Sequence, residues 1–420
     1  MARIWNKFIP LDKKLSNGTS KQSHPVRDSK HSNGAGTPLK PHTSSLRGRH
    51  KQSSFDYAQD KNTPLKRKVF VALSGGVDSA VSLYLLQKQG YEVQAAFMKN
   101  FSDRVNIKGS CPWIEDREEA YRVAAKLQVP IQTFDFQKEY HDKIVNYIFA
   151  TYQKGQTPNP DVLCNNEIKF KLFLERASKL GFDKIATGHY AQIKQDKKGY
   201  HLLRGQDKSK DQSYFLSGLE QWQLAKALFP IGHLEKKKVR QIAKKAGLPN
   251  ADRPDSQGIC FIGKIKLEDF LKQRLKPKIG DIVDSQGRKI GQHQGVWYYT
   301  IGQRNGLNIG GDGPWYVAKK DIQNNRLVMA KADSAELYTK EIRISDLHWL
   351  GQAYKLPLQA KAQIRYRQEL QTVTLSRHSR LDPESQRLVA TFTKPQKGIA
   401  SGQTLAIYKK KELIASGIII

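Results

Sequence analysis

The fold is decided by one stretch of sequence, Val69-Phe70-Val71-Ala72-Leu73-Ser74-Gly75-Gly76-Val77-Asp78-Ser79-Ala80-Val81. It opens with an apolar run that is typical of a buried strand, and this run breaks at two adjacent glycines. Apolar residues then recur at helical spacing as far as Leu86, and Gly90 provides a stop. The stretch therefore predicts a strand, a tight turn and a helix.

The turn has the chemistry of a phosphate-binding site. Gly75 and Gly76 allow positive φ angles and let the backbone approach a ligand without a Cβ in the way. Free N–H groups at the start of the helix favour an anion, and Ser74 and Ser79 add hydroxyl donors. The alternative interpretation is a simple Gly-Gly turn between a strand and a helix, which is a common feature.

Two familiar nucleotide-binding motifs do not fit this turn. No lysine follows the glycines as in G-x-x-x-x-G-K-[ST], and the spacing differs from that of G-x-G-x-x-G. Ser74–Ser79 instead resembles the PP-loop of the ATP pyrophosphatase superfamily. This resemblance implies that ATP is cleaved between its α and β phosphates and that AMP is left on the substrate.

Length and charge limit the possible functions. The chain has 420 residues and a formal net charge of +32. Residues 1–64 hold 12 Lys and Arg against 4 Asp and Glu, so a charge of +24 remains on the other residues. We therefore expect a polyanionic partner such as nucleic acid, with a merely solvated basic surface as the alternative. No apolar run approaches the roughly 18 residues that span a bilayer, so we expect a soluble protein with no membrane partner.

The first 64 residues differ from the rest in composition. They are rich in Ser, Lys, His, Gly and Asn and show no sustained periodicity, which predicts a disordered basic extension. Such a composition loosely resembles a mitochondrial transit segment, although the segment carries several aspartates and no clear amphipathic helix. We expect a bacterial cytoplasmic protein, with a mitochondrial location as the alternative.

Strands and helices alternate after the first turn. Residues 92–98 and 129–136 have the pattern of strands, and a helical pattern starts at Asp116. This alternation predicts an α/β fold with a parallel sheet covered on both faces. Ligands of such sheets lie beyond the carboxyl ends of the strands. Met98 and Gly188, which end or follow two of the strands, should therefore face the phosphate turn.

A stiff loop precedes Cys164. Two prolines restrict the residues before them, so Asn159 and Asp161 are expected in an extended loop. A helix is then predicted to begin near Asn165. This would place Cys164 at or just before a helix N-terminus, where the pKa of a thiol falls. The alternative for Cys164 is a buried apolar residue.

The cysteines point to a reducing compartment. Only Cys111, Cys164 and Cys260 are present, and three cysteines in a long chain without a secretory signal do not make a disulfide scaffold. Gly258 and Gly263 flank Cys260, which suggests a mobile or tightly turned segment. A buried strand is the alternative for this segment.

From about residue 268 the pattern changes to short strand-like runs between Gly-rich turns, such as 279–284 and 296–301. The run Arg377–Gln386 carries charge and a proline, and it is predicted to be a long hairpin loop. We therefore expect four segments in the chain. They are the disordered basic extension (1–64), a PP-loop ATP-binding catalytic domain (65–267), a small central β-rich linking domain (268–340) and a C-terminal β-barrel that binds nucleic acid (341–420).

Several motifs occur together in the order found in one family. They are Ser74–Ser79, Thr157–Asn165, Thr187–Ala191, Lys210–Leu216 and Gly258–Gly263. From about residue 66 to the C-terminus the chain resembles the tRNA-specific 2-thiouridylase family, which replaces O2 of the wobble uridine with sulfur. The resemblance implies a parallel-sheet, adenine nucleotide alpha hydrolase-like domain followed by a linking domain and a tRNA-binding barrel.

The resemblance also implies roles for single residues. Cys164 and Cys260 would be the catalytic pair, with a persulfide on Cys260, and Asp161 would act as a base beside them. Residues implied to bind ATP, with Mg²⁺ on its phosphates, are Ala72, Leu73, Ser74, Gly75, Gly76, Val77, Asp78, Ser79, Met98 and Gly188. Residues implied to touch tRNA are Asn159, Pro160, Asp161, His189, Lys210, Asp211, Gln212, Arg365, Tyr366 and Gln403. Cys111 matches no catalytic motif, and no metal site built from protein side chains is implied.

The implied reaction has two steps. AMP is transferred to O2 of the uracil, and sulfur from the persulfide then attacks C2, after which the cysteine pair can finish as a transient disulfide. A sulfur-relay protein or a cysteine desulfurase would supply the sulfur, and the enzyme would act on the anticodon stem-loop of tRNA as a monomer. Two alternatives stay open at this point: a PP-loop synthetase that adenylates a small molecule, and a non-catalytic RNA-binding protein.

Overall fold

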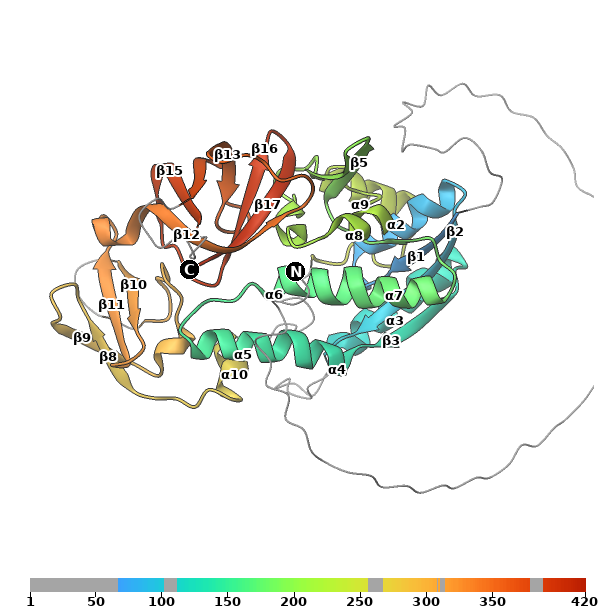
Figure 1. The fold of residues 1–420 in the computed structure, drawn as a ribbon. Helices are drawn as coiled ribbons and strands as arrows, with labels where there is room; N and C mark the ends of the chain where they lie inside the picture. Colours follow the sequence, from blue (N-terminus) through green and yellow to red (C-terminus); the bar gives the residue numbers. More distant parts are fainter. Residues whose placement is uncertain (1–66, 102–111, 256–266, 308, 310–313, 378–387) are drawn as a thin grey trace, which may run out of the picture. The chain divides into compact units, whose positions relative to one another are not determined.

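The computed structural model describes the chain except for residues 1–66, 102–111, 256–266, 308, 310–313 and 378–387 (Figure 1). The predictions for the basic extension, for Cys111, for Cys260 and for most of the 377–386 loop therefore lie outside the described residues. Among the helices that the structure describes, none combines the length and the apolar character that crossing a bilayer requires.

The predicted parallel sheet is confirmed. Its strand order is β3-β2-β1-β4-β7, and every neighbouring pair runs parallel. Strands β2 and β3 lie on one side of β1, and β4 and β7, which come later in the chain, lie on the other. The strand order therefore reverses between β1 and β4. The strands are β1 (Lys68–Ala72), β2 (Glu92–Lys99), β3 (Ile131–Asp135), β4 (Lys184–Ala186) and β7 (Ala227–Leu228).

Both faces of the sheet are apolar because alternate residues of β1 enter two different cores. Phe70 and Ala72 belong to one hydrophobic cluster, whereas Val69 and Val71 belong to another. Helices therefore cover the sheet on both sides, with α2 and α9 on one and α7 on the other (Figure 1). The helices and helical turns of this domain are α2 (Val77–Lys88), α3 (Pro112–Leu127), α4 (Gln137–Tyr140), η2 (His141–Val145), α5 (Asn146–Gln153), α6 (Pro160–Cys164), η3 (Asn165–Leu172), α7 (Phe173–Lys179), η4 (Ser213–Leu216), α8 (Gln221–Lys226) and α9 (Lys236–Lys245).

The central segment forms a small sheet with its own core. Its strand order is β10-β11-β8-β9, and Ile282, Val317 and Leu327 are fully buried within it. The strand predicted at 296–301 is wrong, because the N–H of Tyr298 donates to the carbonyl of Gly295 at 3.1 Å and closes a helical turn there. The elements are α10 (Leu267–Lys272), β8 (Gly280–Val283), β9 (Lys289–His293), η5 (Val296–Tyr298), β10 (Trp315–Asp321), β11 (Arg326–Lys331) and η6 (Ala335–Leu337).

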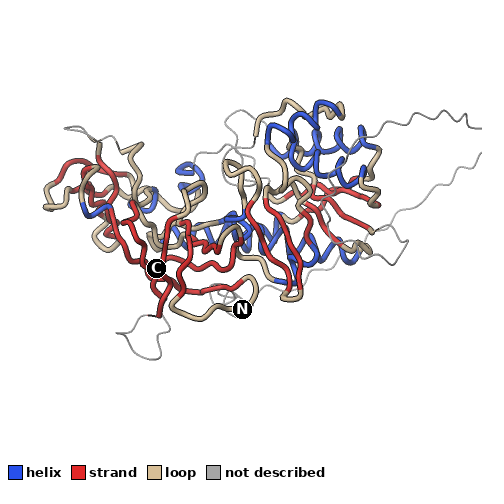
Figure 2. Tube along the Cα trace, turned by 90° about the horizontal axis from the view of Figure 1, so that it is seen from above, coloured by secondary structure: helices blue, strands red, loops and turns tan. Residues whose placement is uncertain are grey.

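The predicted C-terminal barrel is confirmed. Strands β12-β15-β14-β13-β16-β17 pair in that order, and β12 also pairs with β17, which closes the sheet and removes its free edges. Most helices lie around the parallel sheet, whereas the segments that form the other two sheets contain few helices (Figure 2). The barrel strands are β12 (Tyr338–Trp349), β13 (Leu358–Gln363), β14 (Gln371–Arg377), β15 (Leu388–Lys397), β16 (Thr404–Lys409) and β17 (Glu412–Ile419).

A hairpin within the segment 65–267 joins the barrel. Strands β5 (Ala191–Asp196) and β6 (Gly199–Arg204) pair with each other, and β6 then pairs with β17 through Leu202 and Leu413. The barrel sheet therefore continues into the segment that also forms the parallel sheet. The sequence pattern did not show this link, because β5 and β6 look like an ordinary surface hairpin.

A histidine fastens this hairpin to the barrel. The two ring nitrogens of His201 lie 2.7 Å from Oε1 of Glu412 and 2.9 Å from Oδ1 of Asp196. The two carboxylates raise the pKa of His201 above its ordinary value because they favour the charged imidazole, and Glu412 has the larger effect.

This histidine predicts a pH-dependent contribution to stability. Because the folded pKa is raised, the contribution should be complete below the unfolded pKa of about 6.5 and lost as the pH rises through the folded value. Urea unfolding of the wild type and of His201→Gln should differ by up to about 1 kcal/mol at pH 6, since the pair is partly exposed, and by less at pH 9. An equal difference at both pH values would contradict the ionic role.

Candidate active site

The turn Ser74–Ser79, called the nucleotide turn below because it is predicted to bind the phosphates of ATP, connects a strand to a helix as predicted. It connects β1 to α2, with Gly75 at a φ of +80° and Gly76 as the N-cap residue of the helix. Within the turn, Oγ of Ser79 accepts from the N–H of Ser74 at 3.2 Å and donates to the carbonyl of Gly76 at 3.0 Å. These bonds fix the turn without using the N–H groups at the start of α2, which stay available to an anion.

The turn lies where the strand order reverses. Gly188 follows β4, and a Cβ built on it would lie 2.6 Å from the backbone nitrogen of Ser79. Met98 lies near the carboxyl end of β2, which pairs with β1 on the other side. The crevice at such a reversal is the usual ligand site of an open α/β sheet. Met98, Gly188 and the turn are therefore brought to one edge of the sheet, as the sequence predicts.

The outer side of the turn is closed by side chains from a distant segment. Nδ2 of Asn250 and NH1 of Arg253 donate to the carbonyl of Gly75 at 2.9 and 3.1 Å. Arg253 also donates to Oδ1 of Asp116 at 2.5 Å. A Cβ on Gly75 would lie 2.3 Å from the carbonyl oxygen of Asp116, so only glycine fits this position.

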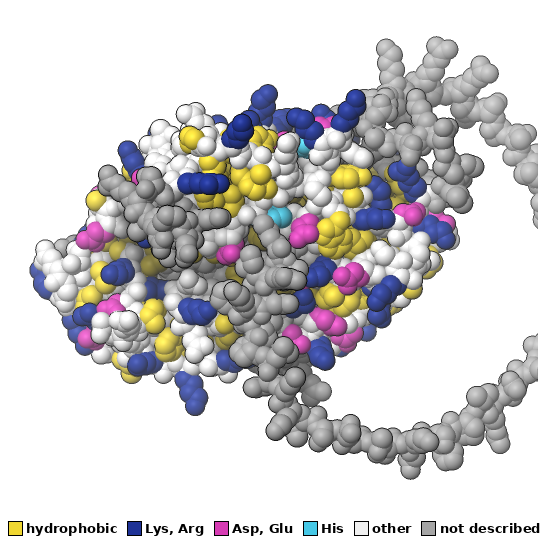
Figure 3. Space-filling view, in the orientation of Figure 1, with side chains coloured by type: hydrophobic (Ala, Val, Ile, Leu, Met, Phe, Trp, Pro, Cys, Tyr) yellow, Lys and Arg dark blue, Asp and Glu magenta, His cyan; other side chains and the backbone are white. Residues whose placement is uncertain are grey.

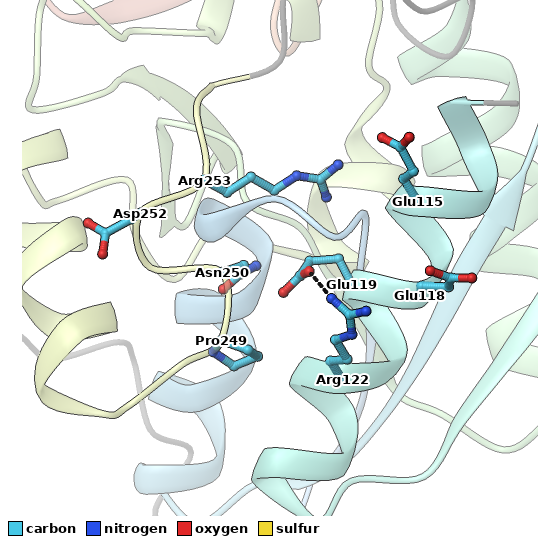
Figure 4. Close-up of a pocket in the computed structure, with 8 residues that line it drawn as sticks. All are labelled: Glu115, Glu118, Glu119, Arg122, Pro249, Asn250, Asp252 and Arg253. Carbon is cyan, nitrogen blue, oxygen red and sulfur yellow. Dashed lines mark hydrogen bonds and ion pairs between the residues drawn. The ribbon is translucent and has the colours of Figure 1, made fainter. Parts of the chain in front are cut away.

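A groove of about 430 Å³ lies on this closed side, between α3 and residues 249–253 (Figure 4). Carboxylates outnumber cations in it, and Arg122 is already paired with Glu119 at 3.3 Å. A triphosphate would be repelled here, so we do not assign the nucleotide to this groove. Its lining residues are Glu115, Glu118, Glu119, Arg122, Pro249, Asn250, Asp252 and Arg253.

The helix that carries Cys164 begins earlier than predicted. Asn159 is its N-cap and accepts from the N–H of Val162 at 3.4 Å, and Pro160 takes the first helical position. The prediction of a helix start near Asn165 is therefore wrong, because Pro160 has the fixed φ angle that suits a first turn. Asp161 lies in that first turn rather than in an extended loop, and Cys164 is the last residue of α6.

The predicted low pKa of Cys164 is also wrong in this state. The side chain is 1% exposed, and burial raises the pKa of its thiol to about 12. The charge of Lys169 lowers this pKa and that of Asp161 raises it, but both effects are smaller than that of burial. Since the peptide continues into η3 without a break, no free helix N-terminus acts on the sulfur. The thiol is therefore protonated at neutral pH.

Cys164 and the nucleotide turn are linked by packing. The helix η3 follows Cys164 directly, and the ring of Phe170 on it lies 5.9 Å from the ring of His189. His189 is the neighbour of Gly188, which contacts the turn. The predicted thiol and the predicted nucleotide site are therefore joined through one layer of side chains. His189 itself is 8% exposed, and burial lowers its pKa well below the ordinary value.

The barrel supports the loop before Cys164. Nε2 of Gln403 donates to the carbonyls of Thr157 and Pro158 at 3.1 and 2.7 Å. Nδ2 of Asn159 lies 3.2 Å from Oγ1 of Thr404. Asn159 and Gln403, both predicted to touch tRNA, thus contribute hydrogen bonds that hold two parts of the protein together.

The predicted run Lys210-Asp211-Gln212 is tied into the fold. Asp211 accepts from the N–H groups of Gly205 and Ser213 at 3.0 and 3.1 Å, and Oε1 of Gln212 accepts from the N–H of Tyr190 at 3.0 Å. Both side chains therefore shape the segment next to the nucleotide turn. Lys210 donates to Oδ2 of Asp255 at 2.7 Å. Its side chain is 28% exposed, close to the 30% of Arg240 and well above the 12% of Lys236, the other two cations paired with that carboxylate.

The predicted pair Arg365-Tyr366 lies where the three domains meet. NH2 of Arg365 donates to the carbonyl of Ile301 at 2.9 Å and also bonds the carbonyl of Gly398. The ring of Tyr366 lies 4.3 Å from that of Phe215. The pair thus connects the central sheet, the barrel and the domain of the parallel sheet, while part of each side chain stays exposed.

The sequence analysis missed an ionic cluster next to the turn. Lys236, the first residue of α9, donates to both carboxylate oxygens of Asp78 at 2.8 Å and lies 2.8 Å from Oδ1 of Asp255. The basic helix itself was visible in the sequence. The sequence does not indicate which of its lysines points inward, because Lys236, Lys237 and Lys238 are adjacent and carry the same charge.

Comparisons with known proteins give a consistent result. Residues 67–264 match the tRNA methyl transferase HUP domain, residues 268–331 the tRNA methyl transferase PRC-barrel domain, and residues 339–419 the aminomethyltransferase beta-barrel domain. A solved 4-thiouridine synthetase–RNA complex with bound ATP aligns with 47% of this chain and 46% of its own, at 16% identity and a TM-score of 0.28.

Curated relatives match over nearly their whole length. A tRNA-specific 2-thiouridylase MnmA from Flavobacterium johnsoniae is 44% identical over 399 residues, which cover 84% of this chain and 100% of the relative. Proteins of the same name from Levilactobacillus brevis and Streptococcus sanguinis are 46% and 44% identical and also cover 84% of this chain and 95% of their own. The chain belongs to the tRNA-specific 2-thiouridylase family.

Proposed function

We propose that this protein catalyses ATP-dependent 2-thiolation of the wobble uridine of tRNA, by adenylating the C2 oxygen and transferring sulfur from a persulfide on Cys260. Family membership supports the tRNA 2-thiouridylase activity and the use of ATP. The observation that carries the proposal for the site is the packing of the Cys164 helix, through Phe170 and His189, against the nucleotide turn.

The nucleotide would bind at the turn and its neighbours. The N–H groups at the start of α2 and the hydroxyls of Ser74 and Ser79 suit the phosphates of ATP. Met98 and Gly188 flank this position from the adjacent strands. Mg²⁺ would travel on the phosphates and lower their negative charge. The full set proposed is Ala72, Leu73, Ser74, Gly75, Gly76, Val77, Asp78, Ser79, Met98 and Gly188.

Adenylation solves the first chemical difficulty. The C2 carbonyl of uracil is a weak electrophile, and oxide is not a leaving group. Transfer of AMP to O2, with pyrophosphate released from ATP, converts that oxygen into a phosphate leaving group. Asn159, Pro160 and Asp161 would hold the base at the amino end of α6, next to Cys164.

Sulfur transfer then uses both cysteines. Cys164, as thiolate, attacks the inner sulfur of the Cys260 persulfide, which forms the Cys164–Cys260 disulfide and releases hydrosulfide. Hydrosulfide attacks C2 and expels AMP, and an external thiol later returns two electrons to the disulfide. Because the pKa of Cys164 is about 12 in the state described here, its proton must leave during the reaction, and Asp161 on the same helix is the proposed acceptor.

Charge supports a nucleic-acid substrate. A net charge of +24 lies outside the first 64 residues, and Lys and Arg side chains are spread over the face in Figure 3 rather than gathered in one patch. A uridine in the anticodon must leave its stack before its C2 edge can reach the site. We propose tRNA contacts at the ten positions assigned from the family resemblance. Asn159, His189 and Asp211 are buried in the state described here, whereas the other seven keep some exposed surface.

The sulfur source and location are further proposals. A sulfur-relay protein or a cysteine desulfurase would load Cys260 with persulfide sulfur, because the reaction consumes one sulfur per tRNA. The relatives named above are bacterial proteins, which supports a bacterial cytoplasmic location for this one.

One assay tests the reaction directly. Pyrophosphate release from ATP and Mg²⁺ is measured with and without unmodified tRNA, a persulfide donor is added, and the digested RNA is examined by mass spectrometry. We expect release that requires tRNA and a uridine that gains the mass of an oxygen-to-sulfur exchange. Release without tRNA would favour a small-molecule synthetase, and no release under any condition would favour an RNA-binding protein.

A further inference from the structure

One lysine is held beside the nucleotide turn by two carboxylates. The ammonium of Lys236 lies 2.8 Å from each oxygen of Asp78 and 2.8 Å from Oδ1 of Asp255. Its side chain is 12% exposed. A lysine desolvated to this degree needs strong anionic partners, and here both partners come from other segments of the chain.

The nucleotide turn has no cation of its own. Its sequence supplies backbone N–H groups and hydroxyls, but no lysine follows the glycines. A triphosphate that is cleaved between its α and β phosphates releases pyrophosphate, whose negative charge must be stabilised as it departs. A lysine can serve this purpose as a compact point charge on a flexible stem.

The position of Lys236 suits this purpose. Asp78, which it contacts, is the second residue of α2, so the ammonium lies one side chain away from the N–H groups of the turn. The hydroxyl of Tyr190 donates to Oδ1 of Asp78 at 2.7 Å and would remain there if the ammonium moved. Asp255 likewise keeps Lys210 at 2.7 Å and Arg240 at 2.8 Å. Neither carboxylate is therefore left without a partner when Lys236 leaves it.

We propose that Lys236 binds the β and γ phosphates of ATP and the departing pyrophosphate, and that Asp78 and Asp255 hold its ammonium ready at the turn in the nucleotide-free protein. On binding, the ammonium exchanges carboxylate oxygens for phosphate oxygens. The proposal rests on the nucleotide site proposed above at Ser74–Ser79. It assigns to Lys236 the positive charge that the turn sequence itself does not provide.

Nucleotide binding without tRNA tests this inference. Calorimetric titration with ATP and Mg²⁺, and separately with AMP, compares the wild type with Lys236→Met. The loss of a charge-assisted contact should weaken ATP about tenfold to a hundredfold. AMP lacks the β and γ phosphates, so its affinity should change by less than about threefold. Lys236→Arg keeps the charge and should recover most of the ATP affinity.

A matched control lies on the same helix. Lys237 is exposed on α9, and Lys237→Met should bind ATP like the wild type. If Lys236 only fastened α9 to α2, Lys236→Met would weaken ATP and AMP equally, and that result would overturn the proposal. Unchanged ATP affinity in Lys236→Met would overturn it too.

A second variant keeps the test decisive if Lys236→Met folds poorly. Asp255→Asn removes one of the two carboxylates that compete with phosphate for Lys236, while Asp78 still holds the ammonium at the turn. We therefore expect Asp255→Asn to bind ATP several-fold more tightly, whereas a purely structural cluster predicts equal or weaker binding. If the wild type binds neither nucleotide, the proposed nucleotide site itself fails. If it binds ATP and all variants match it, only the role of Lys236 fails.

Discussion

Replacing Cys260 by serine should abolish thiolation of tRNA while leaving ATP-dependent adenylation of the same tRNA intact. In the proposed mechanism, adenylation uses the nucleotide turn and the residues proposed to hold the base, Asn159–Asp161, whereas only sulfur transfer needs the persulfide on Cys260. Because serine cannot carry a persulfide, we expect thiolation to fall by at least about a thousandfold. Thiolation is measured by mass spectrometry of digested tRNA, and adenylation by transfer of labelled AMP to tRNA.

Two further variants complete this test. Cys164→Ala should also lose thiolation and should form no disulfide with Cys260, yet it should fold, because it removes only one buried sulfur atom. Cys111→Ser is the matched control, since Cys111 matches no catalytic motif, and it should retain full activity. If Cys260→Ser lost adenylation together with thiolation, the assignment of the persulfide to Cys260 would be untenable.

The parallel sheet and its ligand edge could be predicted because their signals are local. The apolar run of β1, the two glycines and the helical spacing after them all lie within a short stretch, and each has one good structural interpretation. The place of Met98 and Gly188 at the same edge followed from the rule that parallel strands end together. The barrel could be predicted as a class of fold because its strands recur between turns.

The environment of Cys164 could not be predicted because it depends on distant segments. The start of α6 has a local signal, because Asn159 is a good N-cap residue and Pro160 suits the first helical position. The pKa of the thiol has none, because it is set by the surrounding core. The bond between Asn159 and Thr404 joins residues far apart in the chain. For the same reason, no local pattern could single out Lys236 from its charged neighbours on α9.

Gly188→Ala should remove most of the pyrophosphate release that depends on tRNA. A Cβ at this position would lie 2.6 Å from the nitrogen of Ser79 and 2.8 Å from the carbonyl carbon of Asp78, and both are backbone atoms at the start of α2. Since these backbone atoms cannot move independently, the N–H groups that we propose to bind the phosphates must shift together. We expect a fall of at least about a hundredfold in release rate, because misplacement by about 1 Å costs that much, with about 1–3 kcal/mol of lost stability from overpacking.

The control separates the local clash from the general cost of adding a methyl group. Gly291→Ala places its Cβ 3.7 Å from the nearest side-chain atom, on Ile282, so its release rate should stay within about twofold of the wild type. Thermal unfolding of both variants shows whether the chain is folded at the assay temperature. A folded Gly188→Ala protein that releases pyrophosphate at the wild-type rate would mean that the phosphates do not lie against the start of α2. The proposed nucleotide site would then have to be moved away from the edge between β1 and β4.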